Sequence, residues 1–258
     1  MFWKKTAKKD KNDSKVILGM VMSNSQNDFI LNNFIMDYNK FYPDEITNAA
    51  GDNYTSTFTI SEEKAAIVYM DFPIPKGDIR ETAQYAYNWD TVLEDTKNHK
   101  SHFLVSLFNG GPDQVKRFKI FTQVLCSLLR VTGSIGVYKG TQSLLIPKND
   151  YLEEAEFMSD DHLPINLWIY FGLQAAENHN SGYTYGLKEF NKSELEIVNS
   201  RKSVTEIREF LFDISHYVLD QDIIFEDGQT CGGTEDEKIE ITLSKGKFIE
   251  GKSLKLAY

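Results

Sequence analysis

His216 and Asp213 have the residue types and spacing in this chain that come nearest to an acid–base catalyst. On a helix, Asp213 would lie one turn before His216 and Asp220 one turn after it, so a carboxylate could orient the imidazole as a general base. The same spacing is also common in ordinary ion pairs on helix surfaces. No serine or cysteine nucleophile can be placed beside them from the sequence. An enzyme that uses His216 and Asp213 is therefore an alternative, and the pattern alone does not establish one.

A second pair, His99 and His102, has the three-residue spacing that would place two metal ligands on one face of a helix. This segment, however, is predicted to run from a helix end into a strand. We expect His99 to be a solvated cation at the helix end and His102 to have a backbone partner. The sequence contains no H-E-x-x-H motif, no paired C-x-x-C motifs, no phosphate-binding loop and no nucleophile elbow. We therefore expect no metal and no cofactor.

Two acidic clusters favour binding over catalysis. One lies within residues 150–161, which contain no lysine or arginine, and the other flanks Gly232 and Gly233. Neither has the alternating carboxylates of a calcium loop. An acidic run is usually a solvated surface, and the sharper hypothesis is a docking surface for a basic partner. The candidate partner-binding residues are Glu153, Glu154, Glu156, Asp160, Asp161, Asp227, Glu235, Asp236 and Glu237.

Composition restricts the class of protein. The chain has 258 residues, 41% of them hydrophobic, which is enough for one large domain or two small ones. Its net charge is −10, and because six lysines and two aspartates lie in the first 15 residues, the remainder carries −14. An acidic body argues against nucleic-acid binding. The two cysteines form no disulfide framework and no run is long enough for a membrane span, so we expect a cytoplasmic protein without membrane contact.

The elements that must position these residues alternate between helix and strand. Residues 1–15 predict a flexible basic tail without a secretory signal, and residues 16–108 predict a first α+β subdomain. Its β-α-β-β-α-β order is that of a ferredoxin-like layer. The strands are expected at 16–22, 54–60, 65–72 and 102–108, and the helices at 26–41 and from Asp78 onward.

Residues 109–258 predict a second α+β subdomain that packs on the first. Pro112 opens a long apolar helix, and Ser203 with Glu206 forms a capping box for another helix that ends near Asp220. No Pro-rich or low-complexity linker separates the halves, so we expect two ferredoxin-like layers packed as one compact unit. The remaining strands are expected at 135–138, 141–146, 165–173, 183–187, 195–198, 238–243 and 253–256, with a short acidic helix at 149–157.

With these segments in view, the chain resembles the bacterial family labelled "domain of unknown function 4261". The resemblance runs from about Val16 to the C-terminus, and Lys139 stands where that family often has an aromatic residue. It rests on short segments in a fixed order, at residues 72–78, 99–105, 132–140, 163–168, 227–233 and 237–239.

The resemblance provides no catalytic residues to carry over. Members of the family occur beside bacterial toxin and secretion genes, which implies an immunity or partner-binding role. The leading hypothesis is a non-catalytic bacterial immunity protein that neutralises a cognate secreted toxin or effector by protein–protein contact, and the acidic clusters favour a basic partner. A homo-oligomeric adaptor that associates through a sheet edge is a further alternative.

Overall fold

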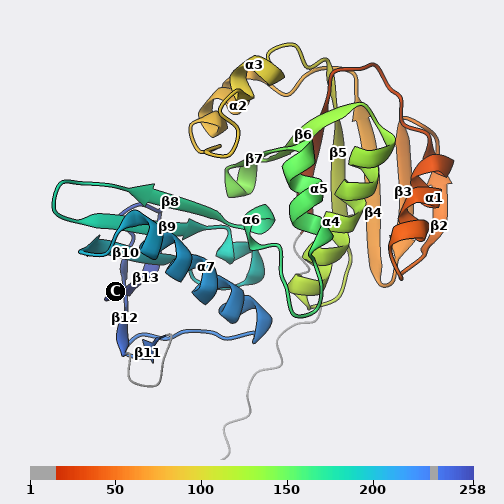
Figure 1. Ribbon diagram of the computed structural model, residues 1–258. Helices are drawn as coiled ribbons and strands as arrows, with labels where there is room; N and C mark the ends of the chain where they lie inside the picture. The colour runs from red at the N-terminus through yellow and green to blue at the C-terminus, as the bar shows by residue number, and fades with distance from the viewer. Residues whose placement is uncertain (1–15, 233–237) are drawn as a thin grey trace, which may run out of the picture.

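The computed structural model describes residues 16–232 and 238–258, which form a mixed α+β protein (Figure 1). The predicted tail of residues 1–15 lies outside the described residues. Three of the candidate acidic residues, Glu235, Asp236 and Glu237, lie outside them as well. Within the described residues the strands form two sheets of seven and six strands.

The first sheet is antiparallel throughout and has the order β2-β3-β4-β5-β1-β6-β7. Side chains alternate across it, so Val21 of β1 packs on one face and Met22 on the other. The seven strands are β1 (Ile17–Ser23), β2 (Ile46–Gly51), β3 (Thr55–Ile60), β4 (Glu63–Met70), β5 (Ser101–Phe108), β6 (Ser134–Lys139) and β7 (Leu144–Pro147).

Helices cover both faces of this sheet (Figure 1). The main face is covered by α1 (Leu31–Phe41) and α4 (Gln114–Val131), and α5 (Lys148–Glu156) packs beside α4. Asp113 caps α4 by accepting a hydrogen bond from the N–H of Lys116. A smaller core on the other face lies beneath α2 (Lys76–Ala83) and α3 (Val92–Thr96).

The second sheet has the order β11-β12-β13-β10-β9-β8, and only its β10–β13 pair is parallel among the described strands. Helix α7 (Val204–Asp220) packs on β8 and β9, and the capping box of Ser203 and Glu206 is confirmed. The six strands are β8 (Tyr170–Gln174), β9 (Asn180–Tyr185), β10 (Leu195–Ser200), β11 (Thr230–Cys231), β12 (Ile239–Lys245) and β13 (Lys252–Leu256).

The α+β class is confirmed, whereas the ferredoxin-like layering is not. In the first sheet β5 lies between β1 and β4, and β6 and β7 extend the sheet past residue 108, where the sequence predicted a subdomain boundary. The second sheet has one long helix and a different strand order. These differences arise because strand neighbours are set by long-range pairing, which local periodicity does not encode.

The predicted strand at residues 165–173 is wrong in its first half. Residues Ile165–Trp168 form a short helix, α6, and the strand β8 starts at Tyr170. A short apolar run fits a buried helix as well as a strand. The helical turn directs the Trp168 indole toward α4, where its Nε1 donates a hydrogen bond of 2.9 Å to Thr122 Oγ1.

Candidate functional site

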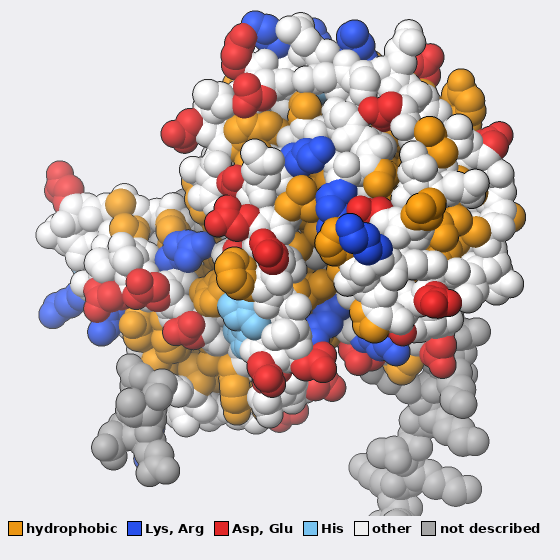
Figure 2. All heavy atoms as spheres, turned by 45° about the vertical axis from the view of Figure 1, so that its right-hand side comes forward, with side chains coloured by type: hydrophobic (Ala, Val, Ile, Leu, Met, Phe, Trp, Pro, Cys, Tyr) orange, Lys and Arg blue, Asp and Glu red, His pale blue; other side chains and the backbone are white. Residues whose placement is uncertain are grey.

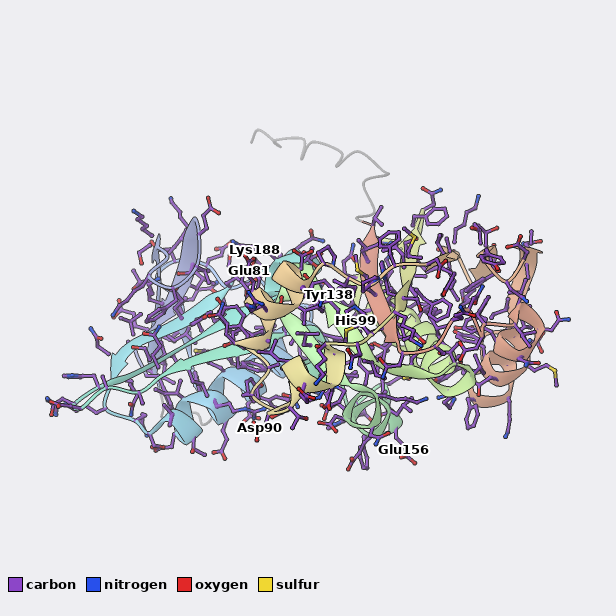
Figure 3. All side chains as sticks on the ribbon, turned by 90° about the horizontal axis from the view of Figure 1, so that it is seen from above. Glu81, Asp90, His99, Tyr138, Glu156 and Lys188 are labelled. Atoms are coloured by element: carbon purple, nitrogen blue, oxygen red, sulfur yellow. The ribbon has the colours of Figure 1, made fainter. Side chains whose placement is uncertain are left out.

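The acidic residues of α5 and the loop after it form an exposed surface. Glu153 and Glu156 project from the helix, and Asp160 and Asp161 follow in the loop. Phe157, at the C-terminal end of the helix, is 65% exposed and lies among them in the sequence. We call these five residues the α5 patch. Figure 3 shows Glu156 on the outer side of α5, away from the helix α2 that carries Glu81.

The α5 patch is acidic although one of its carboxylates has a basic neighbour. Asp160 Oδ1 accepts a hydrogen bond of 3.0 Å from Lys119 Nζ. Asp160 is fully exposed, so solvent screens this pair and it adds little to stability. Figure 2 shows a face of the molecule on which acidic side chains stand beside exposed hydrophobic ones. Such a surface combines an apolar contact with a charged rim.

A groove between α1, α4 and α5 borders the α5 patch and shares Glu156 and Asp160 with it. Phe41, at the end of α1, is 52% exposed on this groove. The Arg130 guanidinium lies 4.2 Å from the centre of the Phe41 ring and forms a two-pronged ion pair with Asp37. These contacts fix the groove wall before any partner arrives.

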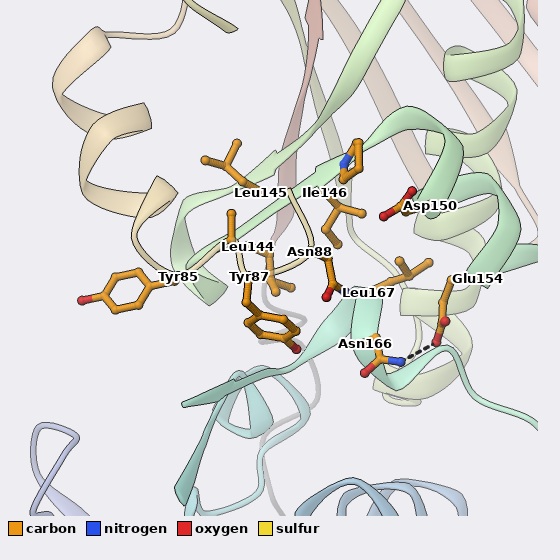
Figure 4. A pocket seen from close by; sticks show the side chains of 12 residues that line it. Tyr85, Tyr87, Asn88, Leu144, Leu145, Ile146, Asp150, Glu154, Asn166 and Leu167 are labelled. Carbon is orange, nitrogen blue, oxygen red and sulfur yellow. Dashed lines mark hydrogen bonds between the residues drawn. The ribbon is translucent and has the colours of Figure 1, made fainter. Parts of the chain in front are cut away.

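A second hollow, which we call the junction cleft, lies where the two sheets meet (Figure 4). The loop between α2 and α3 contributes Tyr87 and Asn88, and α5 contributes Asp150 and Glu154. Asn166 of α6 closes the cleft, where its Nδ2 donates to Glu154 Oε1 at 3.0 Å. The volume of the cleft is about 80 Å³. Glu154, which the sequence predicted as a contact residue, is half-buried, and its carboxylate already accepts a hydrogen bond from the Asn166 amide.

Asp227 was predicted as a contact residue, and its carboxylate has a partner within the chain. Its Oδ1 accepts a hydrogen bond of 2.6 Å from the backbone N–H of Leu243. Gly228, next to it, has φ of 81°, a left-handed conformation that favours glycine. Asp227 thus fastens the loop after α7 to β12, and it lies outside the α5 patch.

His216 and Asp213 are not joined by a hydrogen bond among the described contacts. His216 Nε2 instead accepts the backbone N–H of Leu163 at 3.2 Å, and the centre of its ring lies 6.2 Å from that of His162. This bond ties α7 to the segment before α6. The geometry of a histidine base oriented by Asp213 is not formed in this structure.

The expectation that His99 is a solvated cation is wrong. It is 6% exposed, its Nε2 accepts the N–H of Ile74 at 2.9 Å, and its Nδ1 contacts the carbonyl of Thr96. His102 has the predicted backbone partner, since its Nδ1 lies 2.9 Å from the carbonyl oxygen of Phe72. Burial lowers the pKa of His102. Within the described residues no group of three or more His, Cys, Asp or Glu side chains could hold a metal ion.

Lys139 at the end of β6 is a buried amine that sequence reasoning noted only as a departure from the family pattern. It is 1% exposed, and its Nζ donates to the carbonyl of Leu167 at 3.3 Å. The rings of Phe118 and Phe121 lie 4.8 and 5.8 Å from the same atom. Burial lowers the pKa of Lys139 to about 7. The sequence signal was a lysine in an otherwise apolar strand.

The fold and these sites define a mixed α+β protein with two sheets, an exposed acidic surface and no assembled metal centre among the described residues. None of the described helices has the length and apolar character needed to cross a membrane. The family model described as "Domain of unknown function (DUF4261)" matches residues 183–257, from within β9 to the end of β13, and confirms the resemblance over that segment. No curated protein and no solved structure matches the chain.

Proposed function

We propose that this protein binds a basic partner protein, a secreted bacterial toxin or effector, and neutralises it by contact in the cytoplasm. The observation that carries the proposal is the α5 patch, in which Phe157 is 65% exposed beside four exposed carboxylates. Interfaces gain most of their affinity from a few anchors, often aromatic, inside a polar rim. The body charge of −14 would speed encounter with a basic protein.

The adjoining groove supports the same role. Its apolar wall at Phe41 is continuous with Glu156 and Asp160 of the α5 patch, so one partner could cover both. The carboxylates would meet lysine or arginine side chains at the rim, while apolar partner side chains would contact Phe41 and Phe157. A toxin covered in this way would lose access to its target without any bond being broken.

Charge reversal tests this proposal, and the probe is the product of a neighbouring gene that is toxic in the absence of this protein. We expect the variant Glu153→Lys, Glu156→Lys and Asp161→Lys to bind the toxin at least tenfold more weakly by calorimetry and to lose growth protection on co-expression. The matched control reverses three exposed carboxylates elsewhere, Glu62→Lys, Glu177→Lys and Glu250→Lys. Equal loss in both variants, or no loss in either, would contradict a contact at the α5 patch.

A further inference from the structure

The junction cleft has the chemistry to receive a single cationic side chain. Asp150 and Glu154 lie one helical turn apart on α5, so their carboxylates line the same wall. No lysine or arginine is among the lining residues that the structure describes. Asp150 is exposed and makes no hydrogen bond or ion pair with another described residue. A cation entering the cleft would therefore meet a carboxylate that is not already in an ion pair with a described residue.

The opposite wall is aromatic and polar. Tyr87 is 49% exposed, and the side chain of Asn88 lies beside it on the same loop (Figure 4). A cation over a tyrosine ring gains electrostatic attraction, and the amide oxygen of an asparagine accepts hydrogen bonds. Carboxylates on one wall and a π-face with an amide on the other match a group that is charged, flat and rich in donors.

The walls are held in place from behind. The rings of Tyr85 and Tyr87 contact Tyr170 of β8, with centroid distances of 5.3 and 6.3 Å. Trp89 is 6% exposed and its Nε1 donates to Asp95 at 2.7 Å, which anchors the loop on its far side. Across the cleft, Arg208 donates to Asn166 Oδ1 at 3.0 Å, so the amide that holds Glu154 is itself fixed.

We propose that the junction cleft is the anchor site for one arginine side chain of the partner protein. This inference rests on the proposed function for the identity of that partner. The cleft volume of about 80 Å³ corresponds to about three waters at ~30 Å³ each, which suits the end of one side chain. Arginine fits better than lysine because its planar guanidinium can stack on Tyr87 while its fork of donors reaches a carboxylate and an amide.

The test is a titration of the 15N-labelled full chain with N-acetyl-arginine methylamide, followed by nuclear magnetic resonance. We expect saturable shifts of the backbone amides of Tyr87 and Asn88 and of the Asn166 side-chain amide. The neutral citrulline analogue should give no saturable shift, and the lysine analogue should bind at least threefold more weakly. The Asp150→Asn, Glu154→Gln variant should bind about tenfold more weakly, because charge-assisted hydrogen bonds are lost.

The controls separate this site from the α5 patch. Glutamine at position 154 can still accept from Asn166, so the double variant keeps the wall, and Tyr87→Leu provides a second variant that leaves α5 intact. The variant Glu153→Gln, Glu156→Gln removes equal charge outside the cleft and should bind the probe as the parent does. Three results would overturn the assignment: shifts that fail to saturate, unchanged affinity in the Asp150→Asn, Glu154→Gln variant, or equal affinity for the lysine analogue.

The two proposals fail in different experiments. If the probe does not bind while the toxin is still neutralised through the α5 patch, the arginine site falls and the proposed function stands. If the probe binds at the cleft while charge reversal of the α5 patch leaves toxin binding unchanged, the α5 patch is not the contact surface. In that case the double variant Asp150→Asn, Glu154→Gln should still weaken binding of the toxin about tenfold.

Discussion

Lys139 is a fully buried amine, and no carboxylate of the described residues forms a hydrogen bond or ion pair with it. Glu189 of the 3-10 helix Leu187–Phe190 raises the pKa of Lys139 by less than burial lowers it. The rings of Phe118 and Phe121 and one carbonyl oxygen are its other neighbours. The amine of Lys139 therefore binds a proton more weakly in the folded protein than in the unfolded chain.

Replacing Lys139 by methionine should stabilise the protein and change how its stability depends on pH. The unfolded amine binds a proton below about 10.5 and the folded one only below about 7, so unfolding takes up a proton between these values. The free energy of unfolding should thus rise with pH across this window, by the order of a few kcal/mol. Lys139→Met should abolish this rise, as measured by urea unfolding at pH 7 to 10.

The matched control for this prediction is Lys64→Met on β4, where the lysine is exposed. Its unfolding curve should keep the pH dependence of the parent protein. A rise in stability with pH that survives in Lys139→Met would show that another group carries the linkage.

At the level of single residues, the sequence predicted exposure better than burial. The carboxylates Glu153, Glu156, Asp160 and Asp161 are exposed as an acidic run should be. His99 and Lys139 are buried, and each forms a hydrogen bond with a residue more than 20 positions away, Ile74 and Leu167 respectively. No local sequence pattern predicts such contacts. The junction cleft was missed for the same reason, since Tyr87 and Asp150 meet only through the fold.

Strand β10 fastens two loops through buried carboxylates. Glu194 accepts the N–H groups of Gly186 and Lys188 at 2.9 and 3.1 Å, and burial raises its pKa. Glu196 is 0% exposed and accepts the N–H groups of residues 247–249, together with Ser253 and Lys255. Burial alone would raise the pKa of Glu196, but the hydrogen bonds from Lys255 and the loop outweigh it and hold the pKa below its ordinary value.

Replacing Glu196 by glutamine should loosen the loop at residues 247–249. The N–H groups of the loop now donate to the carboxylate, and the NH2 group of glutamine would place a second donor against them. We expect this change to lower the free energy of unfolding by about 3 kcal/mol. Hydrogen exchange at residues 247–249 should accelerate while exchange in α4 follows only the global change. Glu240→Gln, at an exposed site on β12, is the control. Unchanged exchange at the loop would contradict this role.

At the level of elements, the long helices and central strands were predictable and the order of the sheets was not. α4 and α7 carry apolar residues at helical spacing over several turns, which makes their type clear locally. β2 was missed because all its residues but Ile46 are exposed, so it has no alternating pattern. The pairing of β1 with β5 and β6 joins distant segments, which a single sequence does not specify.

The two sheets are joined by an aromatic cluster at the centre of the molecule. The centroid of the Phe190 ring lies 4.3 Å from the ring centroid of Phe118 on α4 and 5.6 Å from that of Trp168. All three side chains are buried, and Trp168 donates a hydrogen bond to Thr122 on α4. Because each half supplies part of one continuous core, neither buries its apolar surface without the other.

We expect the whole described body to unfold in a single transition. Phe190→Ala should lower the free energy of unfolding by about 3–5 kcal/mol, since it leaves a cavity between the halves. Circular dichroism and tryptophan fluorescence should still report the same midpoint in urea. Phe157→Ala, at a residue 65% exposed, should change stability by less than about 1 kcal/mol. Two separate midpoints would show that the halves fold independently.

The position of β13 has a consequence for how the protein is made. Although β13 is the last strand of its sheet in the sequence, it lies between β10 and β12. On the ribosome, β8, β9 and β10 emerge first and β11 and β12 follow, but the two groups have no direct pairing until residues 252–256 arrive. Until then two strand edges face each other unpaired, which is the arrangement that invites aggregation. The first sheet has a similar gap between β1 and β4, but β5 closes it earlier, once residues 101–108 have been synthesised.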